Sequence, residues 1–357
     1  MATQPEWTLF IVDSAGTGLG VVPYAYELNI TYQLNNPDMA QFKVPVTSSI
    51  ADSIEPGSTY LKAYRRGVGE TTSTLRFYGP VWIVEESGTN SGVDMVTVTA
   101  MGIHNYLTKR FTTAQYTSFT DQGTIIKGII DTTNSTDGET GIRTSVVSTT
   151  VGITRKVDYS DAKLPISEVI SQFGDASDGC DTWITPIELS SGKMGDLNCA
   201  AVRGEFQAGA IFGYGEKTTA NCTTMSRVRT MELVANDVTG YSDNLATQWI
   251  DTSSVANYRR LMADVSFTET ITSEILDYRT RGYLDLHVTP DAVAEVSMIG
   301  GPRAPKLFTD FDIGDFVPVY YQKADIVFYS VNRVYGATIA INEGGVEQFA
   351  SLETRTI

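Results

Sequence analysis

Runs of apolar residues divide the chain into strand-like and helix-like stretches. Over the first 110 residues, short runs rich in β-branched and aromatic residues are separated by clusters of Gly, Pro, Asn and Ser, which is typical of strands joined by turns. The predicted strands are residues 7–12, 24–34, 41–46, 59–64, 75–85 and 94–101. This number of strands in so short a stretch predicts a small antiparallel barrel or sandwich.

The clearest hairpin joins residues 78–86 to residues 93–100. In its first strand, Val81 and Ile83 alternate with Trp82 and Val84, so both faces are apolar. We therefore expect this strand to be covered on both sides, once by its own core and once by another surface.

The middle of the chain changes to helical spacing. Asp121 is a good N-cap, and the apolar residues that follow it recur at the spacing of one helical face: Ile125, Ile126, Ile129 and Ile130. Pro165 begins a second short helix with the same pattern, carried by Ile166, Val169, Ile170 and Phe173. Residues 131–156 are rich in Thr, Ser and Gly and are predicted to be a long hairpin or a mobile loop, and residues 181–240 to be short strands.

A third helix is predicted from Ser253 or Ser254, with one apolar stripe formed by Val255, Tyr258, Met262 and Val265. It would continue, with a break, towards Leu276. The chain then returns to predicted strands at residues 315–321, 326–335, 337–342 and 346–352. The last two are joined across Glu343-Gly344-Gly345, a sequence that favours a tight turn.

These elements predict a β-rich α+β protein with two small antiparallel β-barrels, one at each end, and α+β subdomains between them. The expected boundaries are residues 1–110 for the N-terminal barrel, 111–240 for an α+β insertion, 241–304 for a helical or α+β linker, and 305–357 for the C-terminal strands of the second barrel. Residues 327–352 repeat the strand, turn and strand rhythm of residues 78–100, which suggests that the two barrels are related.

Charge and cysteine content narrow the function. The 357 residues include 42 acidic and 26 basic side chains, for a net charge of −16, which argues against a protein whose main role is to grip nucleic acid. The apolar runs are too short to span a membrane, and residues 1–7 lack the pattern of a signal peptide. The spacing of Cys180, Cys199 and Cys222 predicts neither a disulfide framework nor a zinc site.

Residues with catalytic or ligand-binding chemistry are scattered rather than grouped. The glycines of Gly16-Thr-Gly18-Leu-Gly20 are wrongly spaced for a dinucleotide loop and predict a turn. The histidines, His104 and His287, are expected to be structural or at the surface, since neither has a recognisable catalytic or metal-binding neighbour.

The acidic clusters give no stronger indication of a catalytic or metal-binding site. Glu85 and Glu86 are adjacent on a strand and point to opposite faces. Asp310, Asp312 and Asp315 resemble a cation loop only loosely, whereas Asp175, Asp178 and Asp181 are expected in a solvated loop. We therefore predict no catalytic, cofactor or metal site, and a protein that is not an enzyme.

Two stretches carry a family resemblance. Residues 77–102, which run into His104-Asn-Tyr-Leu107, resemble the close of the N-terminal barrel in the baseplate or tail-tip hub proteins of tailed bacteriophages, the siphophage minor tail proteins especially. Residues 305–319, with the hydrophobic-Gly314-Asp315 entry and the later Val331-Asn-Arg-Val-Tyr335, resemble the start of the last barrel of that family.

The resemblance implies a structural role in the virion. It implies a homotrimeric hub ring in which two similar barrels per chain present a pseudo-six-fold face to the six-fold tail tube. The implied partners are the distal tail protein, tail tube proteins, the tape measure protein, and tip or fibre proteins. DNA would cross an acidic lumen without specific binding. The ring would lie at the distal end of the tail after assembly in the host cytoplasm. Because the chain stops at Ile357, soon after the barrel, wall cutting and receptor binding are expected to belong to other chains.

A second hypothesis is a β-rich carbohydrate-binding or glycan-degrading tail protein. It would use the acidic clusters as general acid and base, or as a calcium site, in a cleft lined by Trp and Tyr. Polysaccharide binding that is lost in Asp312→Ala would favour this alternative.

Overall fold

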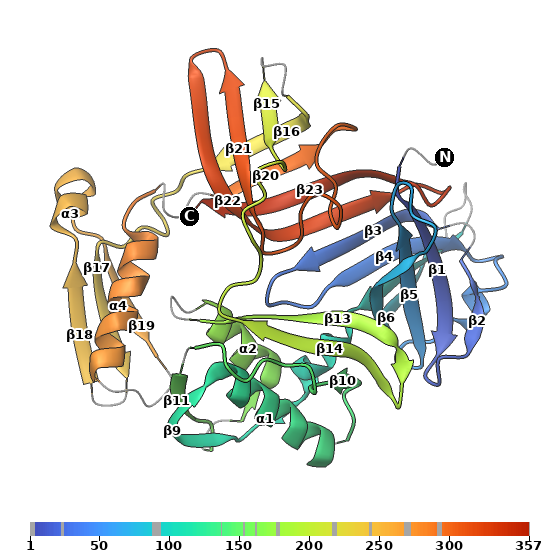
Figure 1. The fold of residues 1–357 in the computed structure, drawn as a ribbon, viewed down its shortest axis with the longest axis horizontal. Helices are drawn as coiled ribbons and strands as arrows, with labels where there is room; N and C mark the ends of the chain where they lie inside the picture. The colour runs from blue at the N-terminus through green and yellow to red at the C-terminus, as the bar shows by residue number, and fades with distance from the viewer. Residues whose placement is uncertain are drawn as a thin grey trace.

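The computed structural model describes residues 4–356 except 23–24, 88–93, 137, 153, 161–162, 176–178, 216–219, 243–244, 268–272 and 291–294. A thirteen-stranded sheet dominates it and contains strands from both ends of the chain (Figure 1). Its strands are β1 (Glu6–Asp13), β2 (Gly18–Val21), β3 (Tyr26–Gln33), β4 (Met39–Pro45), β5 (Thr59–Arg66), β6 (Thr74–Ser87), β7 (Met95–Met101), β15 (Phe212–Gly215), β16 (Cys222–Val228), β20 (Glu295–Gly300), β21 (Phe316–Lys323), β22 (Ile326–Ile341) and β23 (Glu347–Thr356).

The two ends of the chain are joined by direct strand pairing. β22 runs antiparallel to β3, with Ile339 opposite Ile30. The turn after β22 contacts β1, where the Trp7 amide donates to the Gly345 carbonyl at 2.6 Å. Gly345 has φ +77°, and a Cβ there would lie 2.6 Å from the Trp7 carbonyl oxygen, so the predicted Gly-Gly turn is confirmed with a steric reason.

This pairing changes the expected architecture. Among the described residues, the N-terminal and C-terminal strands form one continuous sheet in the order β16-β20-β23-β22-β3-β4-β7-β6-β5-β1-β2, and the pairing does not show two separate closed barrels. One hydrophobic core follows the sheet and unites residues from Trp7 to Ala100 with residues from Ala210 to Leu352. Each set of strands uses the other to cover an edge that it would otherwise expose.

A β-bulge alters the predicted hairpin of β6 and β7. Val81 pairs with Ala100 and Ile83 with Thr99, so Trp82 is an extra residue on β6. Val81 is fully buried, whereas Ile83 is 53% exposed. Within one chain the strand is therefore covered on the Val81 side and open at Ile83, and the expectation that another surface covers the open side stays a prediction. The residues that join the two strands, 88–93, lie outside the described part.

The insertion lies below the large sheet in Figure 1 and folds around a second core, which it shares with Val12, Tyr60 and Tyr78 of that sheet. Its helices are η2 (Ile103–Lys109), α1 (Gln122–Thr136) and α2 (Ile166–Asp175), and its strands are β8 (Phe111–Thr112), β9 (Gln115–Asp121), β10 (Ile142–Arg143), β11 (Thr154–Asp158), β12 (Leu164–Pro165), β13 (Asp181–Ser190) and β14 (Lys193–Ala200). The Gly123 amide donates to the Asp121 carboxylate at 2.9 Å, which confirms the N-cap. The predicted loop at 131–156 is wrong in part, because α1 continues to Thr136.

A third, smaller unit lies to one side in Figure 1. It consists of β17 (Asp237–Ser242), β18 (Leu245–Ile250), β19 (Met262–Ser266), α3 (Thr252–Tyr258) and α4 (Ser273–His287). The helix predicted to carry Met262 and Val265 is wrong beyond Tyr258. α3 ends where Arg259 has φ +64°, and Met262 and Val265 lie on β19. β19 pairs in parallel with β17, and on this strand Met262 and Val265 point to opposite faces, with Met262 exposed.

The last strands are longer than predicted. Residues 326–335 and 337–342, expected as two strands, are the single strand β22, and Gly336 pairs with Gln33 within it. In the described part of the chain, the one remaining helix is the short η1 (Ala51–Ser53). No helix among the described residues is long and apolar enough to cross a membrane.

Candidate functional site

The carboxylates of Asp310, Asp312 and Asp315, just before β21, accept hydrogen bonds from other groups of the same chain. Asp310 accepts from the Lys306 amide at 2.7 Å, and Asp315, which is buried, accepts from the amides of Glu205 and Asp312, each at 2.8 Å. Asp312 accepts from an Arg203 guanidinium nitrogen at 3.2 Å. Among the described residues, no three His, Cys, Asp or Glu side chains form a group able to hold a metal ion.

The local backbone geometry explains why this stretch contains Gly314-Asp315. The loop around Arg203 crosses Gly314 so closely that a Cβ at Gly314, where φ is +94°, would lie 2.7 Å from the Arg203 carbonyl oxygen. Gly204 faces Gly314 just as closely, with a virtual Cβ 2.4 Å from the Gly314 carbonyl. Asp315 then fixes this crossing through its bond to Glu205. The motif therefore joins the C-terminal strands to the chain leaving the insertion.

A buried ion pair reinforces this crossing. Arg333, on β22, donates to the Asp181 carboxylate, to the Arg203 carbonyl at 3.1 Å and to the Gly314 carbonyl at 3.3 Å. The Arg203 amide donates to the same Asp181 carboxylate at 2.5 Å. Asp181 is only 3% exposed. The expectation that it lies in a solvated loop is wrong, because Arg333 and Arg203 draw it into the junction.

The other members of that acidic series do not join the junction. Asp175 ends α2, and Asp178 lies outside the described residues. Glu85 and Glu86 are exposed on β6. The cysteines Cys180, Cys199 and Cys222 are free and buried, with the Sγ atoms of Cys180 and Cys199 3.2 Å apart.

A cavity of about 420 Å³ lies beside the junction. It brings together Asp38, Arg76, His104 and Trp183 from the large sheet and the insertion. Burial raises the pKa of Asp38 to about 7, although a hydrogen bond from the Gln33 amide opposes the shift. Burial lowers the pKa of His104 to about 4, so this histidine is a neutral side chain at neutral pH.

His104 thus lies in the cavity lining as an uncharged side chain, and its expected structural role stays a prediction. His287, at the end of α4, stacks on Tyr283 with ring centroids 4.0 Å apart, and its Nδ1 lies 2.8 Å from the Tyr283 carbonyl. The predicted turn at Gly16 is confirmed, because Asp13 accepts from the Ala15 and Thr17 amides at 2.9 and 2.7 Å.

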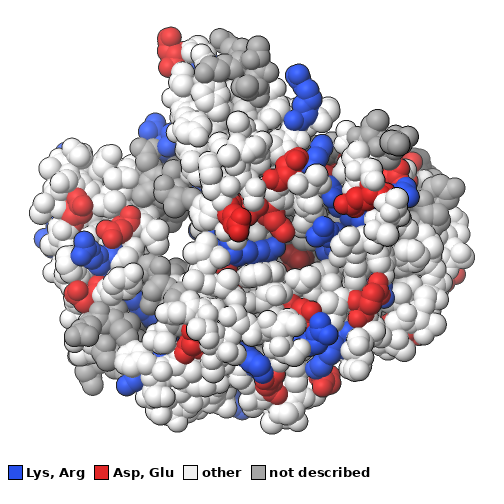
Figure 2. All heavy atoms as spheres, in the orientation of Figure 1, with Lys and Arg blue, Asp and Glu red and all other residues white. Residues whose placement is uncertain are grey.

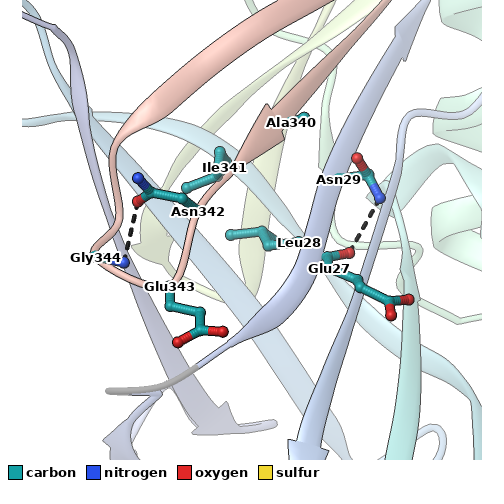
Figure 3. A pocket seen from close by; sticks show the side chains of 8 residues that line it. All are labelled: Glu27, Leu28, Asn29, Ala340, Ile341, Asn342, Glu343 and Gly344. Carbon is teal, nitrogen blue, oxygen red and sulfur yellow. Dashed lines mark hydrogen bonds between the residues drawn. The ribbon is translucent and has the colours of Figure 1, made fainter.

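A second pocket of about 420 Å³ opens where β3 meets the turn after β22 (Figure 3). Asn342 Oδ1 accepts from the Gly344 amide at 3.0 Å and from the Val346 amide at 2.9 Å, and Asn29 Nδ2 donates to the Glu27 carbonyl at 3.0 Å. These polar side chains shape the turn and the strand end. Leu28 and Ile341 form its apolar wall, and its lining holds no nucleophile paired with a base.

Exposed apolar side chains occur both beside Trp82 and on the β21–β22 hairpin. Trp82 is half-buried with its ring 5.7 Å from Tyr106, whereas its neighbour Ile83 is exposed, and Ile339 and Ile341 are buried. A further exposed apolar surface lies on the outer half of the β21–β22 hairpin, where Val327 and Tyr329 are 55% and 64% exposed. We call residues 320–329 the outer hairpin; it projects at the top of Figure 1.

An aromatic stack holds the outer hairpin in place. Tyr214 of β15, Tyr321 of β21 and Phe328 of β22 lie one on another, with centroid separations of 5.5 and 5.2 Å. Val327 and Tyr329 point to the opposite face, since they alternate with Phe328 along the strand. One face of the hairpin is therefore used internally, and the other is open.

Acidic and basic side chains are interspersed on the face shown in Figure 2, and charges of both signs gather in the middle of the view. The pairs Arg333–Asp181 and Arg203–Asp312 place opposite charges together at the junction. The net charge of −16 thus does not produce a wholly acidic surface on this side.

Comparison with known proteins relates the fold to phage tails. No family model and no curated protein sequence matches the chain. Among solved structures, a tail protein from Neisseria meningitidis MC58 superposes with a TM-score of 0.66 at 10% identity, over 98% of this chain and 96% of the other. The 43 kDa tail protein of prophage MuSo2 from Shewanella oneidensis gives 0.62 at 13% identity, over 98% of both chains.

The prophage tail protein gp18 from Listeria monocytogenes EGD-e gives a TM-score of 0.58 at 11% identity, over 98% of this chain and 94% of the other. The similarity to these proteins extends over nearly the entire length of the chains rather than over one domain. The chain therefore has the same overall fold as these tail proteins.

Proposed function

We propose that this protein is a structural component of a phage tail tip, a ring of three copies that adapts the six-fold tail tube to a three-fold tip. The observation that carries the proposal is the match with three phage tail proteins over nearly the whole of both chains. A match of this extent covers the insertion and the small side unit as well as the large sheet. The siphophage resemblance of residues 77–107 and 305–319 points the same way.

In this role, the tape measure protein and then DNA pass through the lumen of the ring. The net charge of −16 supports passage without retention, because clustered Lys and Arg would bind the phosphates. The ring contacts the distal tail protein and tail tube proteins on one side and tip or fibre proteins on the other. It lies at the distal end of the virion tail, after assembly in the host cytoplasm.

The outer hairpin is the surface that we assign to contact between copies. Val327 and Tyr329 are too exposed to contribute to the fold of one chain, and the aromatic stack behind them keeps the hairpin from folding back. A contact between identical chains would remove this apolar surface from water.

Light scattering after size exclusion, followed by negative-stain images, tests the proposal. We expect a ring with three times the 38.9 kDa mass of one chain. Tyr329→Ser should shift the equilibrium towards single chains, whereas Tyr278→Ser, at a 62% exposed tyrosine of α4, should leave it unchanged. A compact monomer under all conditions, including mixture with tail tube proteins, would refute the ring.

The carbohydrate alternative gains no support from the acidic stretch. Asp310, Asp312 and Asp315 accept hydrogen bonds from backbone amides and Arg203, which leaves them poorly placed to act as a general acid and base. A glycan-binding screen with the purified chain and with Asp312→Ala remains the direct test of that alternative.

A further inference from the structure

A groove of about 950 Å³ lies in the insertion, on the side of α1 away from its N-cap. One wall is the continuous stretch of residues 109–116, which includes β8 and the start of β9. The other wall is the second half of α1, with Ile129 and Thr133 buried at the base. Its volume is at the upper end of the range for small-molecule pockets, so it has room for a short peptide segment.

The charge of this groove is opposite to that of the protein. Its charged lining residues are Lys109, Arg110 and Lys163, and none of the described lining residues is acidic. This contrasts with a chain that has 42 acidic against 26 basic side chains. The neighbouring carboxylate Asp158 is already engaged by Gln115 at 2.6 Å and by Ser160. We call this site the basic groove.

The backbone beside the basic groove has an open edge. β8 pairs only with β12 and β9 only with β11 among the described strands, so each lies in a two-stranded sheet. The carbonyls of Arg110 and Ala114 accept from the Ile166 and Tyr159 amides, both on the β11 and β12 side. The other edge of residues 111–116 carries no described strand. Such an edge can pair with an extended peptide.

We propose that the basic groove binds an acidic, extended peptide segment of a partner protein by strand addition along residues 111–116. Lys109 and Lys163 attract the acidic side chains, and the open edge pairs with the peptide backbone. The hydroxyls of Thr113 and Thr132, both exposed in the lining, offer further hydrogen-bond donors to carboxylates, whereas those of Thr133 and Thr136 donate to backbone carbonyls of α1.

The open edge favours a peptide over a nucleic acid. A strand edge presents alternating N–H and C=O groups, which match a peptide backbone but not a row of phosphates. The net charge of −16 also repels a polyanion as long as a nucleic acid, whereas a short peptide meets only the local positive charge. This proposal does not rest on the tail function, because the groove and its charge belong to a single chain.

Fluorescence anisotropy with the full chain tests the proposal. The probe is a labelled, end-blocked peptide of alternating glutamate and valine, about eight residues long, to match a stretch of this size. Three control probes are the same peptide with lysine in place of glutamate, the same peptide with proline in place of valine, and an oligodeoxynucleotide of equal charge.

The protein variants compare two lysines of the groove with one outside it. We expect Lys109→Glu combined with Lys163→Glu to weaken binding of the glutamate peptide about tenfold or more. Lys156→Glu, on β11 beside Phe119, should change it less than about twofold, because Lys156 does not line the groove. Circular dichroism confirms that the variants remain folded.

Each outcome bears on the proposal. Tight binding of the glutamate peptide alone, weakened by salt and by the groove variant, would support it. No binding of that peptide, or equal binding of the lysine peptide, would overturn it. Equal binding of the proline peptide would overturn strand addition, and preferential binding of the oligodeoxynucleotide would replace the peptide by a nucleic acid. A trimeric ring that fails to bind the peptide would leave the tail function standing.

Discussion

Glu347 is a buried side chain whose loss the structure predicts to be costly. It accepts from Arg65 Nε at 3.1 Å and from the Trp7 indole N–H at 3.2 Å. Its side chain and that of Arg65 are 1% and 3% exposed. This pair links β23 to β1 and β5, and so joins the C-terminal strand set to the N-terminal one.

Glu347→Ala leaves the Arg65 charge buried with two weaker contacts, to Thr309 Oγ1 at 3.2 Å and to the Phe308 ring. Removing one partner of a buried pair costs about 3–5 kcal/mol, and the orphaned Trp7 N–H accounts for about 1 kcal/mol of this range. Glu295→Ala breaks the ion pair between Glu295 and Arg355, whose two side chains are 61% and 59% exposed, respectively. This variant should lose less than about 1 kcal/mol of stability.

Urea unfolding followed by tryptophan fluorescence and by circular dichroism measures the difference, at one protein concentration so that self-association does not enter. The two probes must report the same unfolding transition before a free energy of unfolding is assigned. The double variant Arg65→Met with Glu347→Leu should recover part of the loss, because it leaves no buried charge. If Glu347→Ala and Glu295→Ala cost the same, the Arg65–Glu347 pair is not buried as described, and the reasoning fails.

Two further predictions concern the junction and its cavity. Gly314→Ala should destabilise the fold by about 2–4 kcal/mol, because Gly314 has φ +94° and its Cβ would meet the Arg203 carbonyl at 2.7 Å; Gly209→Ala, with open space around its Cβ, is the matched control in the same urea assay and should stay within about 0.5 kcal/mol. The raised pKa of Asp38, about 7 in the fold, means that its favourable contribution is present below its ordinary pKa and is lost as the pH rises through 7. Asp38→Asn should therefore gain stability relative to the unchanged protein as the pH rises from about 4 to about 7, with no further gain above that, and a stability difference that is constant over this range would contradict this assignment.

Local elements could be predicted where one periodicity dominated. Spacing alone identified the four isoleucines of α1, and turn chemistry alone identified the Gly344-Gly345 turn. The helix assigned through Met262 failed because the pairing of β19 with β17 overrides the helical spacing of its apolar residues, and Arg259 ends the helix through its backbone conformation rather than through a recognisable breaker residue. The bulge at Trp82 could not be predicted either, since one extra residue in the strand leaves the run of apolar residues unbroken.

The joined sheet could not be predicted for a different reason. The pairing of β3 with β22 depends on residues such as Ile30 and Ile339, whose sequence neighbours look like those of any buried strand. Likewise Asp181 looks like a loop carboxylate until Arg333 is brought to it by the fold. The basic groove was missed because Lys163 is far in sequence from Lys109 and Arg110, and it joins them only when β12 pairs with β8.

The pairing of β3 with β22 also sets the order in which the protein can be completed during synthesis. Thr31 and Thr338, whose hydroxyls lie 2.9 Å apart across this pair, are 307 residues apart in sequence. Strands β1 to β7 therefore leave the ribosome long before β22 is available, and the edge of β3 must wait for it. Contacts so distant form slowly because a long loop has to close first. The nascent chain thus carries an unpaired, hydrophobic edge for most of its synthesis, and a chain shortened before β22 would keep that edge permanently open to other strands.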